Sequence, residues 1–247
     1  SEGRGNAKRY WHATSTSIPG SRAGQVEHFR ELLFDAVRIR LRSDVPVGSS
    51  LSGGLDSSSI VATIDAQKSS QAVHQKTFSA RFRSRQHDEG HFMDLVTYQA
   101  EAEAHEVWVE PELFLAEFER LQWHQEEPIA STSPFAQWLV MRLAQENDTT
   151  VLLDGQGADE LLAGYDQAQG MLWAHWLRRG RVDKVGREVF AFARRYHTLR
   201  DPVLFSAYYS LPGRLRDELV ERYYRSTKTV SPELHREFAP SHVDSPE

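Results

Sequence analysis

A short segment rich in glycine and serine contains the residue types that bind phosphorylated ligands. It lies between an apolar run that ends at Leu51 and a second one that begins at Ser59. Its residues are Ser52, Gly53, Gly54, Leu55, Asp56, Ser57 and Ser58. Adjacent glycines let the backbone approach an anion closely, and a following helix offers unpaired N–H groups at its positive end. Because Asp56 alone would repel phosphate, the segment indicates a triphosphate site with a bridging Mg²⁺ ion.

A second glycine-flanked acidic segment, residues 154–160, follows a later apolar run. In open α/β sheets, ligands bind at the loops that follow the carboxyl ends of the strands. Asp56 and Asp159 could then share one Mg²⁺ ion on a polyphosphate. Plainer interpretations exist: Asp56 and Ser57 could simply cap a helix, and Asp159 with Glu160 could be an ordinary acidic helix start.

The hydrophobic pattern predicts strands at about 45–51, 74–82, 105–109 and 149–153. Between them it predicts helices at about 25–41, 59–68, 89–104, 111–124 and 134–145. Strands alternating with helices at this pitch indicate an α/β fold with a Rossmann-like parallel sheet and flanking helices. We expect five strands in this sheet and a helical C-terminal part after about residue 164.

The composition narrows the class of protein. The chain has 247 residues, 40% hydrophobic and 26% charged, which is ordinary for a water-soluble globular protein. A formal net charge of -6 gives no reason to expect binding to nucleic acid. With no cysteines, the chain has no disulfide, thiolate zinc site or cysteine nucleophile. It has no apolar run long enough for a signal peptide or membrane span, so we expect a cytoplasmic protein without membrane contacts.

The two loop segments, in this order, resemble two signatures of the glutamine-hydrolysing asparagine synthetase family. Residues 44–58 resemble its pyrophosphate loop, and residues 154–165 resemble its second signature. Residues 77–82, 88–89 and 126–128 also fall where similar sequences have a strand, a helix start and an acidic-proline turn. The resemblance covers roughly residues 10–225. It implies the C-terminal synthetase domain of this family, within the PP-loop ATP pyrophosphatases, and a fold like that of the adenine nucleotide alpha hydrolases.

The resemblance also implies the site residues. Those matching the triphosphate and Mg²⁺ positions are Ser52, Gly53, Gly54, Asp56, Ser57 and Ser58. Those matching the adenosine positions are Leu51, Ala80 and Gly155, with Asp154 beside them. Asp159 matches the second metal-binding and catalytic aspartate. Gln156 matches a catalytic position that is acidic in typical members and is linked there to formation of the acyl-adenylate.

The implied activity is that of a ligase using ATP and Mg²⁺. It would adenylate a carboxylate, most simply that of aspartate, release pyrophosphate and form asparagine with ammonia. Gln156 can donate and accept hydrogen bonds but cannot act as a base. This substitution leaves other functions open: a ligase that amidates a sugar acid, closes a lactam or cyclises a peptide, or an ATP-binding module without catalysis.

The expected organisation has three parts. Residues 1–24 would be an extended lead-in from a missing N-terminal glutaminase domain, and residues 25–165 the ATP-binding core. Residues 166–247 would be a truncated helical continuation. Lys184 and Lys228 lack the context of the family's catalytic lysine, which we therefore expect outside this fragment. The resemblance also implies a homodimer.

Overall fold

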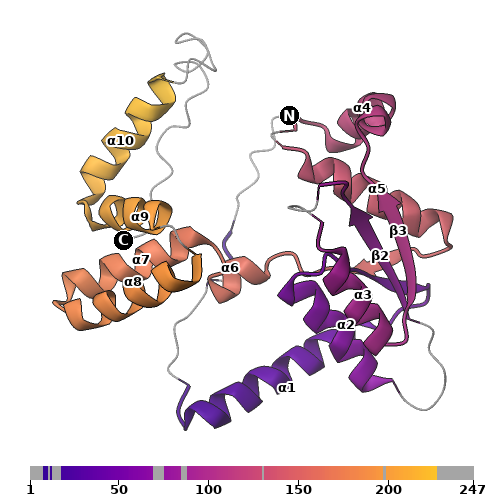
Figure 1. Cartoon of the computed structure of the whole chain (residues 1–247), viewed down its shortest axis with the longest axis horizontal. Coiled ribbons are helices and arrows are strands. Elements are labelled where there is room, and N and C mark those ends of the chain that lie inside the picture. Colours follow the sequence, from indigo (N-terminus) through magenta and orange to yellow (C-terminus); the bar gives the residue numbers. More distant parts are fainter. Residues whose placement is uncertain are drawn as a thin grey trace. The chain divides into compact units, whose positions relative to one another are not determined.

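The computed structural model describes residues 8–10, 12, 18–68, 75–84, 88–129, 131–196 and 199–226. The chain forms two compact units, residues 1–156 and residues 157–247. In Figure 1 the described elements of the second unit are coloured from salmon to yellow. The division into an ATP-binding core up to residue 165 and a helical continuation concerns function, and it stays a prediction.

A parallel sheet forms the centre of the first unit. Its strands are β1 (Val47–Ser50), β2 (Lys76–Arg81), β3 (Glu103–Trp108) and β4 (Val151–Leu153), in the order β3-β2-β1-β4. All neighbouring strands are parallel, which confirms the α/β Rossmann-like class. Within the described residues the sheet has four strands rather than the five expected. Because β1 pairs with β2 on one side and β4 on the other, the strand order reverses beside β1.

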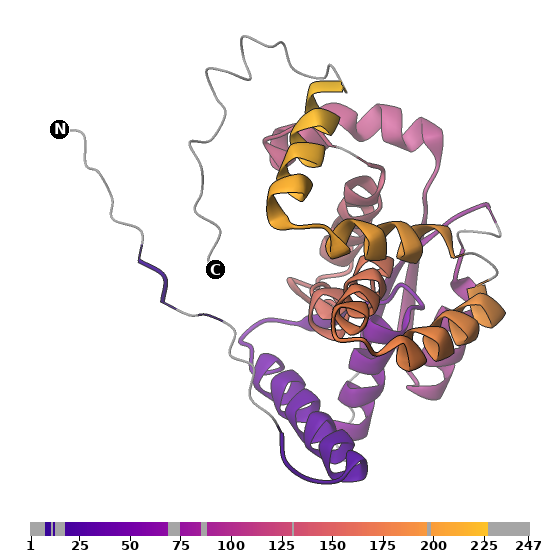
Figure 2. The ribbon, with the colours of Figure 1, turned by 90° about the vertical axis from the view of Figure 1, so that its left-hand side faces the viewer.

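Helices cover both faces of this sheet. They are α1 (Arg22–Arg40), α2 (Leu55–Gln67), α3 (Gly90–Gln99), α4 (Pro111–Gln125) and α5 (Ser133–Glu146). Leu51 packs with Val61 of α2 and Met93 of α3. Phe78 of β2 packs instead with Val140 of α5. Figures 1 and 2 both show α1 alongside α2, and the two helices are in contact.

The structure starts α1 three residues earlier than the sequence predicts. Ser21 is its N-cap, and the Oγ of Ser21 accepts a hydrogen bond from the Gly24 N–H at 3.2 Å. Of the expected lead-in, residues 22–24 are thus helical, and much of the remainder lies outside the described residues. In contrast, α4 begins at the predicted Pro111, where proline lacks only an N–H that the helix leaves unpaired.

The described part of the second unit is helical. It contains α6 (Ala158–Leu162), α7 (Asp166–Arg178), α8 (Val182–Tyr196), α9 (Arg200–Ser210) and α10 (Gly213–Ser226). Trp173 of α7 is 1% exposed and meets Phe192 of α8 edge-on, with ring centroids 5.9 Å apart. The contact between Trp173 and Phe192 therefore packs α7 against α8.

In the described ranges, every helix is too short or too polar to cross a membrane.

The packing around β1 generates the first prediction. A β-carbon at Gly48 would lie 2.7 Å from Phe78 Cε2 and 3.1 Å from Thr149 Cγ2. Gly48→Ala should lower the free energy of unfolding by about 1–3 kcal/mol because the core would be overpacked. Urea unfolding followed by circular dichroism measures this.

Gly24→Ala in α1 is the matched control. A β-carbon at Gly24 meets only Ser21 Oγ, at 3.6 Å, so this change should leave stability unchanged or raise it slightly. Equal stability of the two variants would contradict the packing described for Gly48.

Candidate functional site

The glycine-serine segment begins at a fixed point of the core. The Leu51 N–H donates to the Phe78 carbonyl at 2.9 Å, and Ser79 Oγ donates to the Leu51 carbonyl at 2.7 Å. The Leu51 side chain is 1% exposed and belongs to the core. The expected part of Leu51 in adenosine binding stays a prediction. Its side chain anchors the start of the loop in the core. Ser79 is a site-supporting residue that the sequence reasoning missed; a polar residue inside an apolar strand is the signal that could have found it.

Two serines hold the loop closed. The Ser52 N–H donates to Ser57 Oγ at 3.2 Å, and the two hydroxyl oxygens lie 3.0 Å apart. The Gly54 N–H donates to Ser52 Oγ at 3.3 Å. Ser57 is 6% exposed, so its hydroxyl shapes the loop from inside, whereas Ser52 is exposed. The loop is therefore preformed around its own hydroxyl groups.

The start of α2 offers donors to an anion. Gly54 is the N-cap, and no side chain caps this helix. The first intrahelical bond runs from the Ser58 N–H to the Gly54 carbonyl at 3.1 Å. The interpretation that Asp56 and Ser57 simply cap the helix is therefore wrong. An uncapped N-terminus on a 13-residue helix is a favourable position for phosphate.

Gly53 brings the loop against the start of α3. Its φ is +84°, and a β-carbon there would lie 2.9 Å from both the Cβ and the carbonyl oxygen of Glu89. Only glycine combines this backbone conformation with this proximity at low cost. Glu89 therefore packs directly against the loop at Gly53.

An ion-pair network fixes the chain just before Glu89. The Arg81 Nε and Nη2 donate to the two carboxylate oxygens of Asp88, both at 2.9 Å, and Arg81 Nη1 donates to Glu106 Oε1 at 2.7 Å. The Phe82 N–H also donates to Asp88 Oδ1, at 3.1 Å. The Arg81 hydrogen bonds are the main reason that the pKa of Asp88 lies below its ordinary range, and the same bonds raise the pKa of Arg81.

Sequence reasoning noted the Asp88-Glu89 pair but missed this network. The signal was an arginine at the end of a predicted strand followed seven residues later by an aspartate. Such a spacing alone does not show that the two side chains meet.

The second predicted segment meets the first directly. A β-carbon at Gly155 would lie 3.1 Å from both Asp56 Cβ and the Ser57 nitrogen, so the loop after β4 touches the start of α2. Asp154 Oδ1 accepts from the Gln156 N–H at 3.2 Å, and the Gln156 residue is exposed. The two segments therefore meet at the carboxyl edge of the sheet, as the sequence predicted.

Ala80 lies near the carboxyl end of β2, opposite Val107 of β3. It is partly buried and packs against the cluster formed by Phe78, Val140 and Ala144. Its expected role beside adenosine stays a prediction.

Asp159 belongs to the second unit, in the first turn of α6. It is partly buried, and the neighbouring Glu160 accepts a hydrogen bond from the Tyr165 hydroxyl at 2.9 Å, which raises the pKa of Tyr165. The described residues hold no cluster of three or more His, Cys, Asp or Glu side chains suited to a metal. The sharing of Mg²⁺ by Asp56 and Asp159 stays a prediction, and such an ion would need oxygen ligands from the phosphates.

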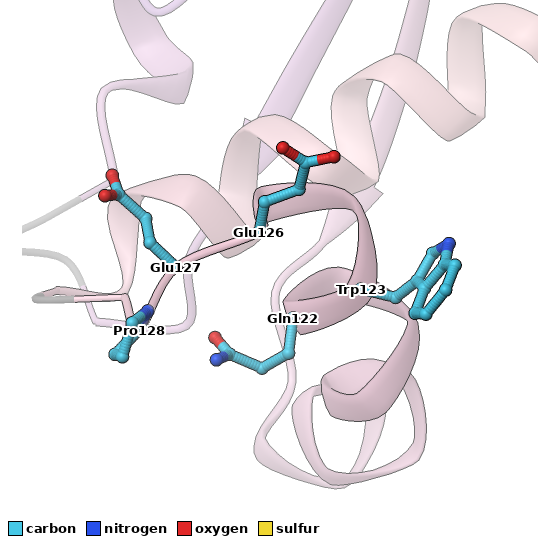
Figure 3. Close-up of a pocket in the computed structure, with 5 residues that line it drawn as sticks. All are labelled: Gln122, Trp123, Glu126, Glu127 and Pro128. Carbon is cyan, nitrogen blue, oxygen red and sulfur yellow. The ribbon is translucent and has the colours of Figure 1, made fainter. Parts of the chain in front are cut away.

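The acidic-proline turn lines a shallow hollow of about 390 Å³. Helix α4 ends at Gln125, and the Glu126 N–H donates to the Gln122 carbonyl at 3.1 Å from a left-handed backbone conformation, φ +61°. Figure 3 shows Trp123 extending away from Glu126 and Glu127. Trp123 is 81% exposed, so its ring does not close this hollow.

The Arg81 network generates the second prediction. Asp88→Asn should lower the free energy of unfolding at pH 7 by about 2 kcal/mol, because hydrogen bonds to charged groups contribute about 1.5–3 kcal/mol. Since folding lowers the pKa of Asp88 below 3.8, this stability is present above that pH and is lost as the pH falls through the folded-state pKa. The difference between the two proteins should therefore shrink below about pH 3.8.

Urea unfolding at a series of pH values measures this difference. Asp35→Asn is the control, since the Asp35–Arg38 pair lies on the exposed surface of α1 and should contribute about 0.5 kcal/mol or less. A pH-independent difference for Asp88→Asn would contradict the role assigned to the ionised carboxylate.

Comparison with known proteins gives one family. The family model described as asparagine synthase matches residues 28–245. Asparagine synthetase (glutamine-hydrolysing) 1 of Bacillus subtilis is 34% identical over 162 residues, which are 64% of this chain and 24% of that protein. A Methanocaldococcus jannaschii protein assigned as glutamine-hydrolysing asparagine synthetase 2 is 33% identical over 156 residues, 63% of this chain and 30% of that protein.

A relative with another name also matches. Amidase chyE of Penicillium rubens is 29% identical over 152 residues, 57% of this chain and 23% of that protein. The chain thus spans less than a third of the length of each of these three relatives. Because the family model matches most of the chain, including both loop segments, the chain belongs to the asparagine synthase family.

Proposed function

We propose that this chain is the ATP-binding part of an amide synthetase that activates a carboxylate as its adenylate. The observation that carries the proposal is the contact between the loop after β4, at Gly155, and the uncapped start of α2. This contact lies where the strand order reverses, which is where open α/β sheets bind ligands. Membership of the asparagine synthase family supports ATP-dependent amide synthesis as the reaction.

The triphosphate would lie against the start of α2. Backbone N–H groups of residues 53–57 and the hydroxyls of Ser52 and Ser58 would donate hydrogen bonds to it. The adenosine would lie at the carboxyl ends of β1 and β2, near Ala80 and Gly155. Asp56 and Asp159 would hold Mg²⁺, which neutralises phosphate charge when bound.

The proposed reaction has two steps. A carboxylate oxygen of the substrate attacks the α-phosphorus of ATP, and pyrophosphate leaves with the electrons of the broken P–O bond. Ammonia then attacks the acyl carbon, loses a proton and displaces AMP. The chain would contribute mainly positioning and donors for the developing negative charge. Aspartate is the favoured substrate, with asparagine as the product.

Gln156 is the observation that favours a second candidate. Its exposed side chain is neutral, so it would bind substrate or adenylate through hydrogen bonds alone. This candidate is an amide-forming member with another carboxylate, such as a sugar acid or the precursor of a lactam or cyclic peptide. One matched relative is named an amidase rather than an asparagine synthetase. A nucleotide-binding module without catalysis would bind ATP and release no pyrophosphate.

The rest of the system is also proposed. Two of the relatives are named glutamine-hydrolysing, so a glutaminase domain would supply the ammonia. The catalytic lysine would come from a part of the protein outside this segment. Homodimerisation is proposed from the family alone.

The third prediction tests adenylation. The longer parent protein, supplied with ATP and Mg²⁺, should release pyrophosphate when aspartate is added, measured with a coupled phosphate assay. Asp56→Ala should abolish binding of ATP–Mg²⁺ by calorimetry and with it pyrophosphate release, because it removes a carboxylate facing the phosphates.

Asp65→Ala is the matched control. Asp65 lies near the other end of α2 and pairs with Lys68 at 3.1 Å, so its removal should leave ATP binding unchanged. Wild-type ATP binding by Asp56→Ala would contradict the proposed metal site. ATP binding without pyrophosphate release across a panel of carboxylates would establish the non-catalytic module instead.

The fourth prediction concerns Gln156. If its neutral side chain limits the reaction, Gln156→Glu should raise aspartate-dependent pyrophosphate release about 100-fold, the lower end of what one positioned acid or base contributes. Gln156→Ala is the control for loss of the amide. Lower activity in Gln156→Glu would indicate a pocket built around the amide and a substrate other than aspartate.

A further inference from the structure

The second unit contains a cavity that none of the residues assigned above lines. Its volume is about 560 Å³, within the usual range for small-molecule sites, and it lies among α7, α9 and α10 beside the end of α6. Figures 1 and 2 show α7 and α9 side by side, with α10 following α9. Its polar lining includes Arg178, Arg216, His175 and Tyr209.

The two arginines of this cavity have no carboxylate beside them among the described lining residues. No acidic residue lines it, and within the described part of the chain neither Arg178 nor Arg216 forms an ion pair. Arg178 Nη1 donates to the Tyr209 carbonyl at 3.4 Å, and the Arg216 guanidinium lies 5.9 Å from the centroid of the Tyr209 ring. Two guanidinium groups therefore converge around one tyrosine.

Arg216 has a buried donor without an acceptor. Its Nε atom is buried and has no hydrogen-bond partner among the described residues. A buried donor on a charged group is costly when it is unpaired, and an oxyanion would satisfy it. A guanidinium offers two parallel N–H groups, which match the oxygens of a carboxylate or phosphate.

Tyr209 is held in place for a further contact. Its hydroxyl oxygen accepts a hydrogen bond from Gln167 Nε2. The hydroxyl hydrogen then remains available to donate to an acceptor in the cavity. His175 adds a ring nitrogen that can donate as well.

Part of the lining is apolar. Met171 and Leu172 of α7 line the cavity and are 48% and 39% exposed. An inorganic ion would leave these side chains in water, whereas a ligand with a hydrocarbon body would cover them.

We propose that this cavity binds an organic oxyanion, a carboxylate or a phosphate monoester, whose apolar body packs on Met171 and Leu172. The charged group would pair with Arg178 and Arg216 and accept a hydrogen bond from Tyr209. Nothing in this proposal depends on nucleotide binding at α2.

Calorimetric titration of the whole chain tests it, with hexanoate, hexyl phosphate, hexylamine and hexanol as probes. Hexanoate or hexyl phosphate, or both, should bind saturably, and which of them binds more tightly identifies the charged group. Hexylamine and hexanol should bind at least tenfold more weakly. From butanoate to hexanoate, each added methylene should tighten binding about fourfold.

Arg178→Gln and Arg216→Gln should each weaken binding of the anions at least tenfold. Arg179→Gln is the matched control, because Arg179 is exposed and does not line the cavity. Met171→Glu, which puts a carboxylate beside the arginines, should abolish anion binding, and circular dichroism checks that each variant folds. This variant keeps the test decisive if Arg216→Gln fails to fold.

Three outcomes would overturn the proposal. These are absence of saturable binding of both anions, equal affinity for hexanol, and unchanged affinity in folded Arg178→Gln and Met171→Glu. Equal affinity for acetate and hexanoate would contradict the packing of the ligand's apolar body on Met171 and Leu172.

Discussion

The arrangement of the candidate site depends on how closely β1 is held between its two neighbours. Its carboxyl end is tied to β2 through Leu51, whose N–H and carbonyl bond to Phe78 and Ser79. On the other side, Gly155 after β4 lies against the first turn of α2. Because Gly155 lies this close to the backbone of α2, a larger side chain at Gly155 would separate the loop after β4 from the start of α2. The start of α2 and the loop after β4 are thus held against each other by packing.

An ion pair fixes the chain next to the glycine-serine loop. The Arg81–Asp88 pair holds the chain that leads into α3, and the start of α3 forms the wall against which Gly53 turns. A bidentate, largely buried pair suits this task because its planar geometry fixes orientation as well as distance. For Asp56, in contrast, the role of a Mg²⁺ ligand stays a prediction.

The two units contain different candidate sites. The first contains the parallel sheet and most residues of the proposed nucleotide site, while the second begins at Gly157 and contains Asp159 in α6. The helices of the second unit also line a cavity that holds Arg178 and Arg216. Neither arginine forms an ion pair with another described residue, and the family signatures do not involve this cavity.

The sequence alone determined the fold class, the order of strands and helices, and the two loop segments, because hydrophobic periodicity and the glycine-flanked acidic motifs are local patterns. It predicted α4 at Pro111 correctly but missed the Ser21 cap and expected one strand more than the described sheet contains. Only the tertiary structure decided that Leu51 and Ser57 face inward, that Gly155 touches the start of α2, and that Arg81 meets Asp88. The physical reason is that packing and ion pairing join residues distant along the chain, and no local pattern specifies which of them meet.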